Sequence, residues 1–459
     1  MNRTPYTLPL PEDARRTLAS GWLVLALVSL AASGVLSVLL VLSRAPAVKD
    51  VFPLVDFFHV ALVAHVDLSV LVWFLAFAGA LWTLNSTPRA LSLGWAALAL
   101  ALAGTALMAT APFAGTGHPV MSNYIPVLDE PVFLSGLVAF GAGVALAVGR
   151  GMLAVPRVGV RLDGTGALRF GLNTSLVAAG VALIAFAWSL WAVPRALEAK
   201  GYYELAFWGG GHVLQFTYTL LMFVAWLWLA ETGGAPLPLT PRTVALLFGI
   251  GLASVFLTPV IYLAYDVGSV EHHRMLTWLM RFGGGLAILP FALAVVVGLA
   301  RAGPPAGGER VLRAALLASL ILFGAGGVIG LMISGSNVKI PAHYHGSIVG
   351  VTLAFMGLAY QLLPRLGFGE ASARWAVPQL WLYAGGQMLH VLGLLWSGGY
   401  GVQRKVAGAA ETLRSTEEIV AMGVMGIGGL IAVIGGTLFL VLAIGALLRG
   451  RGRRAHAPG

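Results

Sequence analysis

Twelve apolar runs, each long enough to cross a lipid bilayer, occupy almost the whole chain. A transmembrane helix needs about 20 consecutive apolar residues. The runs fall near 20–43, 54–84, 90–113, 130–150, 168–195, 203–231, 243–266, 275–301, 311–335, 340–364, 376–397 and 418–448. Only 10% of the residues are charged, against about 25% in soluble domains. The sequence therefore predicts an all-α, polytopic membrane protein with twelve transmembrane helices in a single membrane domain, residues 20–448.

The basic residues predict how these helices are oriented. Residues 1–19 form a polar N-terminal tail, and residues 449–459 form a basic C-terminal tail. With the N-terminus inside, most of the 28 lysines and arginines fall on the inner side, as the positive-inside rule requires. We therefore predict a bacterial-type inner-membrane protein with both termini in the cytoplasm. The net charge of +10 is explained by this bias, and no nucleic-acid binding is predicted.

Six histidines lie within or beside the apolar runs and share the predicted outer half of the membrane. They are His65, His212, His272, His273, His343 and His345. Imidazole is a common ligand of haem iron and copper, and polar groups in lipid are costly and usually functional. A single membrane histidine more often makes a helix–helix hydrogen bond, which is our interpretation of His59 and His390. Taken together, the six histidines are predicted to be cofactor ligands.

The spacing of the histidines predicts which of them can share a cofactor. An α-helix turns about 100° per residue, so His343 and His345 point to nearly opposite sides and each can bind a different cofactor. His272 and His273 can lean toward one metal ion, with His212 as a third ligand. Three imidazoles favour copper, whereas non-haem iron would favour an added carboxylate. The chain has no cysteine, which excludes thiolate metal sites, iron–sulfur clusters and covalent c-type haem.

With this pattern the chain resembles the catalytic subunit I of the haem–copper oxidase superfamily, and most closely the B-type oxidases. The resemblance rests on the order of the segments VAHVDLSVLVW, GGGHVLQF, VEHHRMLTW, PAHYHGSIVG and GYGVQRK. It implies two haems and one copper. The implied ligands are His65 and His345 for a low-spin haem, His343 for a high-spin haem, and His212, His272 and His273 for copper. Arg404 and Lys405 match basic residues that meet the haem propionates.

Two departures from the family pattern leave the substrate open. A and B types have a tyrosine four residues after the histidine that matches His212, but here that position is Phe216, preceded by Gln215. The glutamate of known nitric oxide reductases is also missing. Tyr218 and Tyr265 are possible substitutes, since C-type oxidases keep their tyrosine on the following helix, near Tyr265. Gln215 is expected to face the metal, one helical turn from His212.

The expected activity is that of a respiratory terminal oxidase that reduces O2 to water, with nitric oxide reduction as the alternative. The electron donor is then a subunit II, a cytochrome c or a quinol, because a thiolate copper centre cannot lie on this chain.

Asp67, two residues after His65, is either a packing residue or a proton carrier. A haem-free transporter, the rival class, would show charged residues near the midplane and repeat-related broken helices; few such charges and no repeat are visible.

Overall fold

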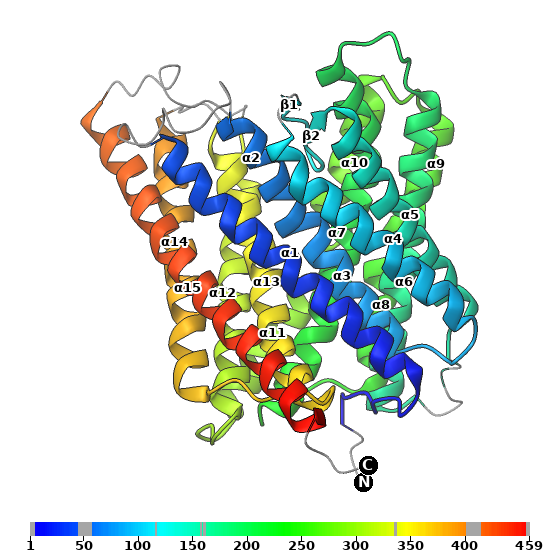
Figure 1. Ribbon diagram of the computed structural model, residues 1–459, viewed down its shortest axis with the longest axis vertical. Coiled ribbons are helices and arrows are strands. Elements are labelled where there is room, and N and C mark those ends of the chain that lie inside the picture. The colour runs from blue at the N-terminus through cyan, green and yellow to red at the C-terminus, as the bar shows by residue number, and fades with distance from the viewer. Residues whose placement is uncertain are drawn as a thin grey trace. The chain divides into compact units, whose positions relative to one another are not determined.

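The computed structural model describes most of the chain and consists almost entirely of α-helices (Figure 1). The described ranges are 5–44, 57–114, 117–156, 158, 162–334, 337–400 and 415–455, without the side chains of 41–44 and 451–455. Arg404 and Lys405 lie outside these ranges. The described helices fall into two compact units, residues 1–227 with 237–296, and residues 228–236 with 297–459. The prediction of a single membrane domain stays a prediction.

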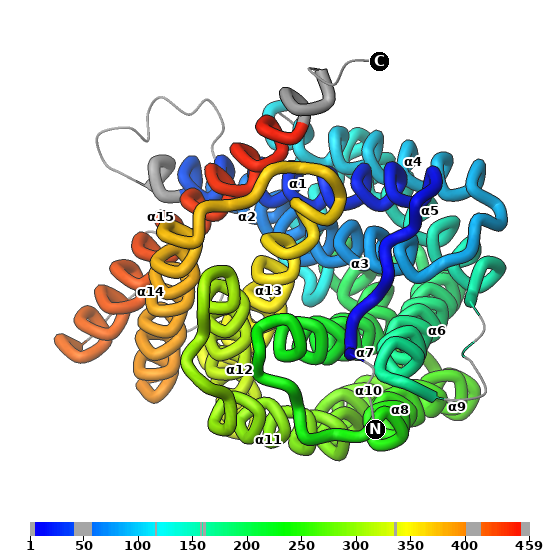
Figure 2. The backbone as a smooth tube through the Cα atoms, turned by 90° about the horizontal axis from the view of Figure 1, so that it is seen from below, coloured from blue at the N-terminus to red at the C-terminus, as the bar shows by residue number. Residues whose placement is uncertain are grey.

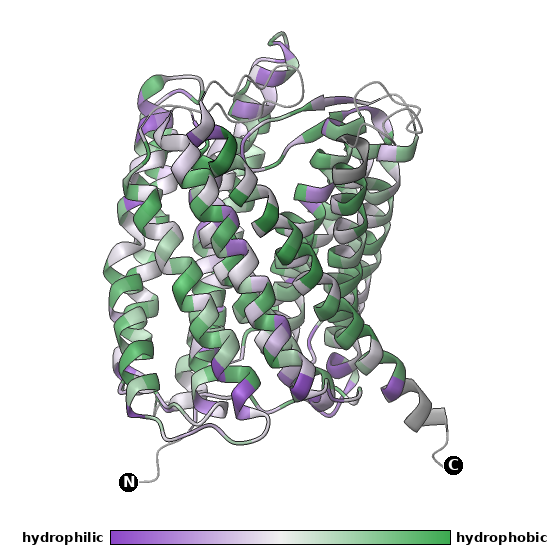
Figure 3. Ribbon diagram, turned by 90° about the vertical axis from the view of Figure 1, so that its left-hand side faces the viewer, coloured by the Kyte–Doolittle hydropathy of each residue, from purple (hydrophilic) through white to green (hydrophobic). Residues whose placement is uncertain are grey.

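The first unit contains the N-terminal helices and most of α7 and α11. Its elements are α1 (Ala14–Arg44), α2 (Phe57–Val66), η2 (Asp67–Val72), α3 (Trp73–Leu84), α4 (Leu91–Thr110), η3 (Ala111–Phe113), β1 (His118–Val120), β2 (Val127–Asp129), α5 (Pro131–Leu153), α6 (Gly164–Ala192), α7 (Ala199–Thr232), α8 (Pro241–Ala253), η4 (Ser254–Phe256), α9 (Leu257–Ala264), α10 (Val270–Gly283) and α11 (Gly285–Arg301). Figure 3 shows that hydrophobic residues predominate along the helices of the structure.

The second unit contains the last turns of α7 and α11 and four long helices. These are α12 (Glu309–Leu331), α13 (Lys339–Arg365), α14 (Ala373–Gly399) and α15 (Thr416–Ala455). The helices α14 and α15 run side by side (Figure 2). Their backbones approach closely at Gly393, where an added Cβ would lie 2.7 Å from the carbonyl oxygen of Ala421. Small residues at such crossings are typical of helices packed in lipid.

The membrane character predicted from the apolar runs is confirmed. By length and composition, eleven helices within the described residues could cross a membrane, and several of them include a break, such as α2–η2–α3 and α10–α11. The remaining predicted run, near 376–397, corresponds to α14, which has 27 residues and is long enough to span. It carries Arg374, Gln379, Gln387 and His390, so its hydropathy is lower than that of the other helices.

Two local features interrupt the regular helices of the first unit near the predicted ligands. Directly after His65 the chain forms the π-helix η2, a rare conformation that often marks functional sites. In the loop before α5, β1 and β2 pair antiparallel, with His118 opposite Asp129 and Val120 opposite Val127. This short hairpin fixes both ends of the loop 121–126.

Candidate functional site

His212 on α7 is held by a backbone carbonyl that leaves its second ring nitrogen open. Its Nδ1 lies 2.7 Å from the carbonyl oxygen of Trp208. A carbonyl can only accept, so Nδ1 carries the proton and Nε2 of the neutral imidazole keeps its lone pair. The side chain is buried, and the Trp208 ring lies 4.6 Å from it, centroid to centroid. His212 is therefore oriented as a metal ligand is expected to be.

The three glycines before His212 make room for aromatic rings around it. A Cβ added at any of them would overlap a ring from another segment. The pairs are Gly209 with Tyr262, Gly210 with Phe186, and Gly211 with Tyr124. The run GGGH thus brings the rings close to the backbone of α7, one turn or less before the histidine.

His272 and His273 lie in the first turn of α10, which Ser269 caps. The Oγ of Ser269 accepts a hydrogen bond from the backbone N–H of His272 at 3.1 Å, which is the usual N-cap arrangement. His273 stacks on Trp208 with the centroids 4.4 Å apart, and the Trp208 Nε1–H donates to the carbonyl oxygen of His273 at 3.3 Å. Trp208 therefore connects the two helices that carry His212 and His273.

His272 is fully buried, and neither of its ring nitrogens has a hydrogen-bond partner among the described residues. An unpartnered buried polar group costs about 1–3 kcal/mol, and a metal ligand bond would remove that cost. The rings of His272 and His273 lie 6.4 Å apart. Within the part of the chain that the structure describes, no three His, Cys, Asp or Glu residues are close enough to hold one metal ion. The three-histidine copper site therefore stays a prediction.

Tyr262, rather than Tyr265, lies against the histidines. Its ring packs edge-to-face on His272 with the centroids 4.7 Å apart. Its hydroxyl is 2.7 Å from the Oγ of Ser189 and donates to the carbonyl oxygen of Ala185 at 3.1 Å. Tyr265 follows the end of α9 and is 37% exposed. The sequence interpretation overlooked Tyr262, although it lies one helical turn from Tyr265.

The other residues singled out on α7 lie in different surroundings. Phe216 is buried, and its ring lies close to Gly283 of α10. Gln215 is only partly buried, and its expected contact with a metal stays a prediction. Tyr218 packs edge-to-face on Phe74, 4.7 Å between centroids. Its hydroxyl is buried and has no partner among the described residues.

His65 at the end of α2 shows the same backbone support as His212. Its Nδ1 lies 2.9 Å from the carbonyl oxygen of Ser33 on α1, and the Ser33 hydroxyl donates to the carbonyl oxygen of His65 at 3.0 Å. Asp67 starts the π-helix, is fully buried, and has no hydrogen-bond partner for either carboxylate oxygen among the described residues.

In the second unit, His343 and His345 point to different helices, as their spacing predicts. The Nδ1 of His343 lies 2.7 Å from the carbonyl oxygen of Gly326 on α12. A Cβ at Gly330 would lie 2.7 Å from that same nitrogen, so only glycine leaves room for the ring. His345 packs on His390 of α14 with the centroids 4.7 Å apart.

The predicted ligands have donor sets that fit haem or copper. In His65, His212 and His343 the Nδ1 is bonded to a carbonyl, and no described residue hydrogen-bonds to the Nε2. Metal-bound histidines almost always donate their other ring N–H in this way. His390 also bonds through Nδ1, to the carbonyl oxygen of Met425 at 3.0 Å, as expected for a helix–helix contact.

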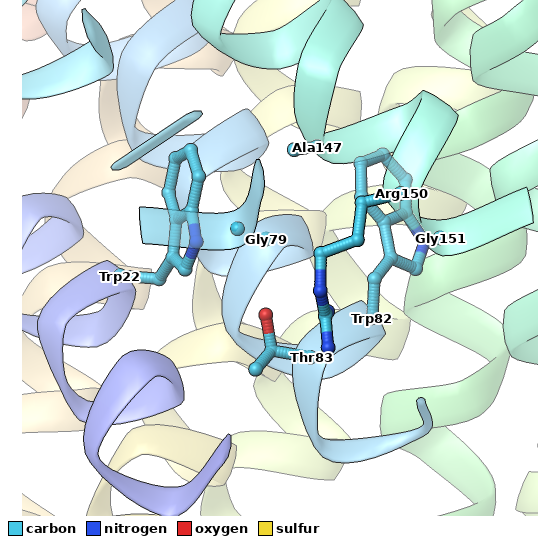
Figure 4. Close-up of a pocket in the computed structure, with 8 residues that line it drawn as sticks. Trp22, Gly79, Trp82, Thr83, Ala147, Arg150 and Gly151 are labelled. Atoms are coloured by element: carbon cyan, nitrogen blue, oxygen red, sulfur yellow. The ribbon is translucent and has the colours of Figure 1, made fainter. Parts of the chain in front are cut away.

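A separate small cavity in the first unit contains no histidine. It is lined by Trp22, Gly79, Trp82, Thr83, Gly94, Ala147, Arg150 and Gly151 (Figure 4). The buried Arg150 donates to the carbonyl oxygens of Ala90 and Thr87, both at 3.2 Å, and to the Oγ of Ser86 at 3.1 Å. Its charge supports the turn between α3 and α4, which is a structural role.

The fold and the site define a class of protein, a helical membrane protein with histidines inside the membrane, three of which are supported by backbone carbonyls. The family model "Cytochrome C and Quinol oxidase polypeptide I" matches residues 17–438. The chain therefore belongs to the haem–copper oxidase family, as a subunit I-like polypeptide. The family implies haems and a copper or iron site.

Two relatives and one solved structure extend the comparison. An uncharacterized protein of Rickettsia prowazekii is 30% identical, over 94% of this chain and 96% of that protein. An uncharacterized protein of Aquifex aeolicus is 27% identical, over 76% of this chain and 85% of that protein. The solved structure of a haem–copper terminal oxidase dimer aligns with a TM-score of 0.72 and 16% identity, covering 95% of this chain and 85% of that one. At this identity the solved structure supports the fold alone.

Proposed function

We propose that this chain is the catalytic subunit of a respiratory terminal oxidase that reduces dioxygen to water. The observation that carries this choice is the contact between Tyr262 and His272. Reduction of O2 to two waters consumes four electrons and four protons. A phenol beside a metal ligand can deliver one of each, so Tyr262 can supply what Phe216 cannot.

The ligand assignments follow the sequence and the family. His65 and His345 would hold the low-spin haem, His343 the high-spin haem, and His212, His272 and His273 the copper. Arg404 and Lys405 would bind the haem propionates through charge-assisted hydrogen bonds. When bound, the high-spin haem and the copper would supply electrons and a binding place for the diatomic substrate.

The residues of the chain itself prepare the site. Carbonyls of Trp208 and Gly326 set the ring directions of His212 and His343, which removes ring reorientation from the cost of binding a metal. Tyr262 holds its proton at Oη, where its partners are Ser189 and the carbonyl oxygen of Ala185. Gly209 leaves the space that this hydroxyl occupies.

Nitric oxide reduction is the second candidate, and Phe216 is the observation that favours it. Two NO molecules give N2O and water with two electrons and two protons, so no tyrosine is required.

The electron donor under either activity is a subunit II, a cytochrome c or a quinol. We place the protein in a bacterial-type inner membrane with both termini in the cytoplasm, on the distribution of basic residues.

The two activities are separated by the variants Tyr262→Phe and Tyr265→Phe. We expect the wild type to consume O2 faster than NO with the same electron donor. Tyr262→Phe should lower O2 reduction at least 100-fold, the order of loss for a positioned proton donor, while haem and copper contents stay unchanged. Tyr265→Phe is the matched control and should be nearly silent. Rapid NO turnover with negligible O2 uptake in the wild type would favour the alternative.

A further inference from the structure

The loop between β1 and β2 is tied to α7 by a carboxylate. Glu204 accepts two hydrogen bonds from Asn123, one from the backbone N–H at 2.9 Å and one from the side-chain amide. Glu204, Trp208 and His212 follow one another at intervals of four residues, so they lie along one face of α7. A second bond inside the loop, from the Ser122 hydroxyl to the carbonyl oxygen of Ile125 at 2.6 Å, closes a tight turn.

Tyr124, between these anchors, has a backbone conformation that costs energy. Its φ is +68°, in the left-handed region that non-glycine residues adopt rarely and at a cost of about 1–2 kcal/mol. Such conformations persist only where the surrounding structure over-determines them. Here the bond from Ser122 to Ile125 spans the turn, and the bonds from Asn123 to Glu204 tie it to α7.

This conformation places the Tyr124 ring on His212. The ring centroids are 4.8 Å apart, and Trp208 lies 6.0 Å from Tyr124. The ring occupies the space beside Gly211, and its hydroxyl contacts the Sδ of Met280 on α10 at 3.7 Å. The ring of Tyr124 therefore covers the imidazole of His212.

We propose that Glu204 and Asn123 are positioning residues that lock Tyr124 over the imidazole of His212. This lock, which consists of Glu204, Asn123 and Tyr124, closes the outer end of the cluster formed by Trp208, His212 and His273. It also prevents rotation of the His212 ring. The inference rests on the proposed function for the role of His212 as a metal ligand. The locking geometry itself does not depend on that role.

The first test probes the lock in metal-depleted protein. Diethyl pyrocarbonate modifies accessible imidazoles, and mass spectrometry of peptides locates the modified residue. In the wild type we expect His212 to be protected. Glu204→Ala should release the loop, so that His212 is modified at least ten times faster and amide exchange of residues 117–130 accelerates. Glu204→Gln keeps one acceptor oxygen and should restore part of the protection.

Tyr203→Phe is the matched control. It removes the hydrogen bond from the Tyr203 hydroxyl to Asp129 Oδ1 at 3.2 Å, which joins the same helix to the same loop. The phenylalanine keeps the stacking on Phe207, 5.8 Å between centroids. Since this contact does not involve Tyr124, the control should protect His212 as the wild type does. Equal modification rates of His212 in Glu204→Ala and the wild type would overturn the proposal.

The second test links the lock to the metal. Loss of a residue that orients a metal ligand typically lowers metal affinity about 10–100-fold. We expect this loss in copper titrations of Glu204→Ala and Asn123→Ala, while the low-spin haem absorbance stays at the wild-type level. If the wild type bound no copper or iron besides haem, the proposed function would be refuted. The modification experiment would then decide by itself whether Glu204 and Asn123 hold Tyr124 over His212. Unchanged copper affinity in both variants would overturn the positioning role.

Discussion

The histidines of the two units are oriented by different means. In the second unit, His343 and His345 sit two residues apart on one helix, so helix geometry sends them to different neighbours. His343 reaches the carbonyl oxygen of Gly326 on α12, and His345 packs on His390 of α14. In the first unit, His212 and His272 come from different helices, and each is packed by aromatic rings, Trp208 for His212 and Tyr262 for His272. The separation of His343 and His345 in the second unit therefore follows from a single helix, whereas the surroundings of His212 and His272 in the first unit depend on tertiary packing.

The comparison implies different sensitivities to mutation. A locally determined direction survives changes in neighbouring segments, because the helix backbone maintains it. A direction that depends on packing is lost when any of the surrounding rings moves, since interiors are close-packed and respond to a change of one methyl group.

The largest effect is expected from the two histidines of α13. His345→Ala should remove the low-spin haem spectrum, and His343→Ala should abolish ligand binding by the high-spin haem while leaving the low-spin bands. Each variant should lose its component almost completely, because each removes an iron ligand. Reduced-minus-oxidised and carbon monoxide difference spectra measure the two components. If both variants lost the same component, the two directions on the helix would not correspond to two cofactors.

An intermediate effect is expected from Gly211→Ala in the first unit. The new Cβ would overlap the Tyr124 ring, and overpacking of this kind costs about 1–3 kcal/mol. The matched control is Gly201→Ala on the same helix, where an added Cβ meets nothing within 4 Å. The control should be neutral or gain up to about 1 kcal/mol from helix propensity. Apparent unfolding temperatures in detergent compare the two, and equal temperatures would contradict the packed arrangement around His212.

Much of the second unit's arrangement could be predicted from the sequence, because the rotation per residue of a regular helix is known. The same rule fails after His65, where the π-helix changes the rotation, so the direction of Asp67 could not be derived. The contact of Tyr262 with His272 depends on the packing of α6, α7 and α9, which no spacing encodes. The one available signal was the glycine run before His212, which indicates a close approach of bulky groups.

The packing partner of His345 was likewise not predictable, since His390 follows it by 45 positions on another helix. His390 in turn hydrogen-bonds to the carbonyl oxygen of Met425, which lies on a third helix, α15. Contacts of this kind depend on how α13, α14 and α15 pack. The sequence could only suggest that a single membrane histidine makes a helix–helix hydrogen bond, and the bond to Met425 confirms that interpretation.

The smallest effect is expected from His390→Phe. The variant loses the hydrogen bond from Nδ1 to the carbonyl oxygen of Met425, and such interhelical bonds contribute about 0.6 kcal/mol on average in membrane proteins. His390→Gln can still donate to that carbonyl and serves as the control. Because the direction of His345 is set by its own helix, the low-spin haem spectrum should keep its intensity in both variants, and the apparent unfolding temperature should fall slightly in His390→Phe alone. Loss of the low-spin band from a folded His390→Phe protein would instead mean that His390 orients His345, and that the second unit also depends on packing between helices.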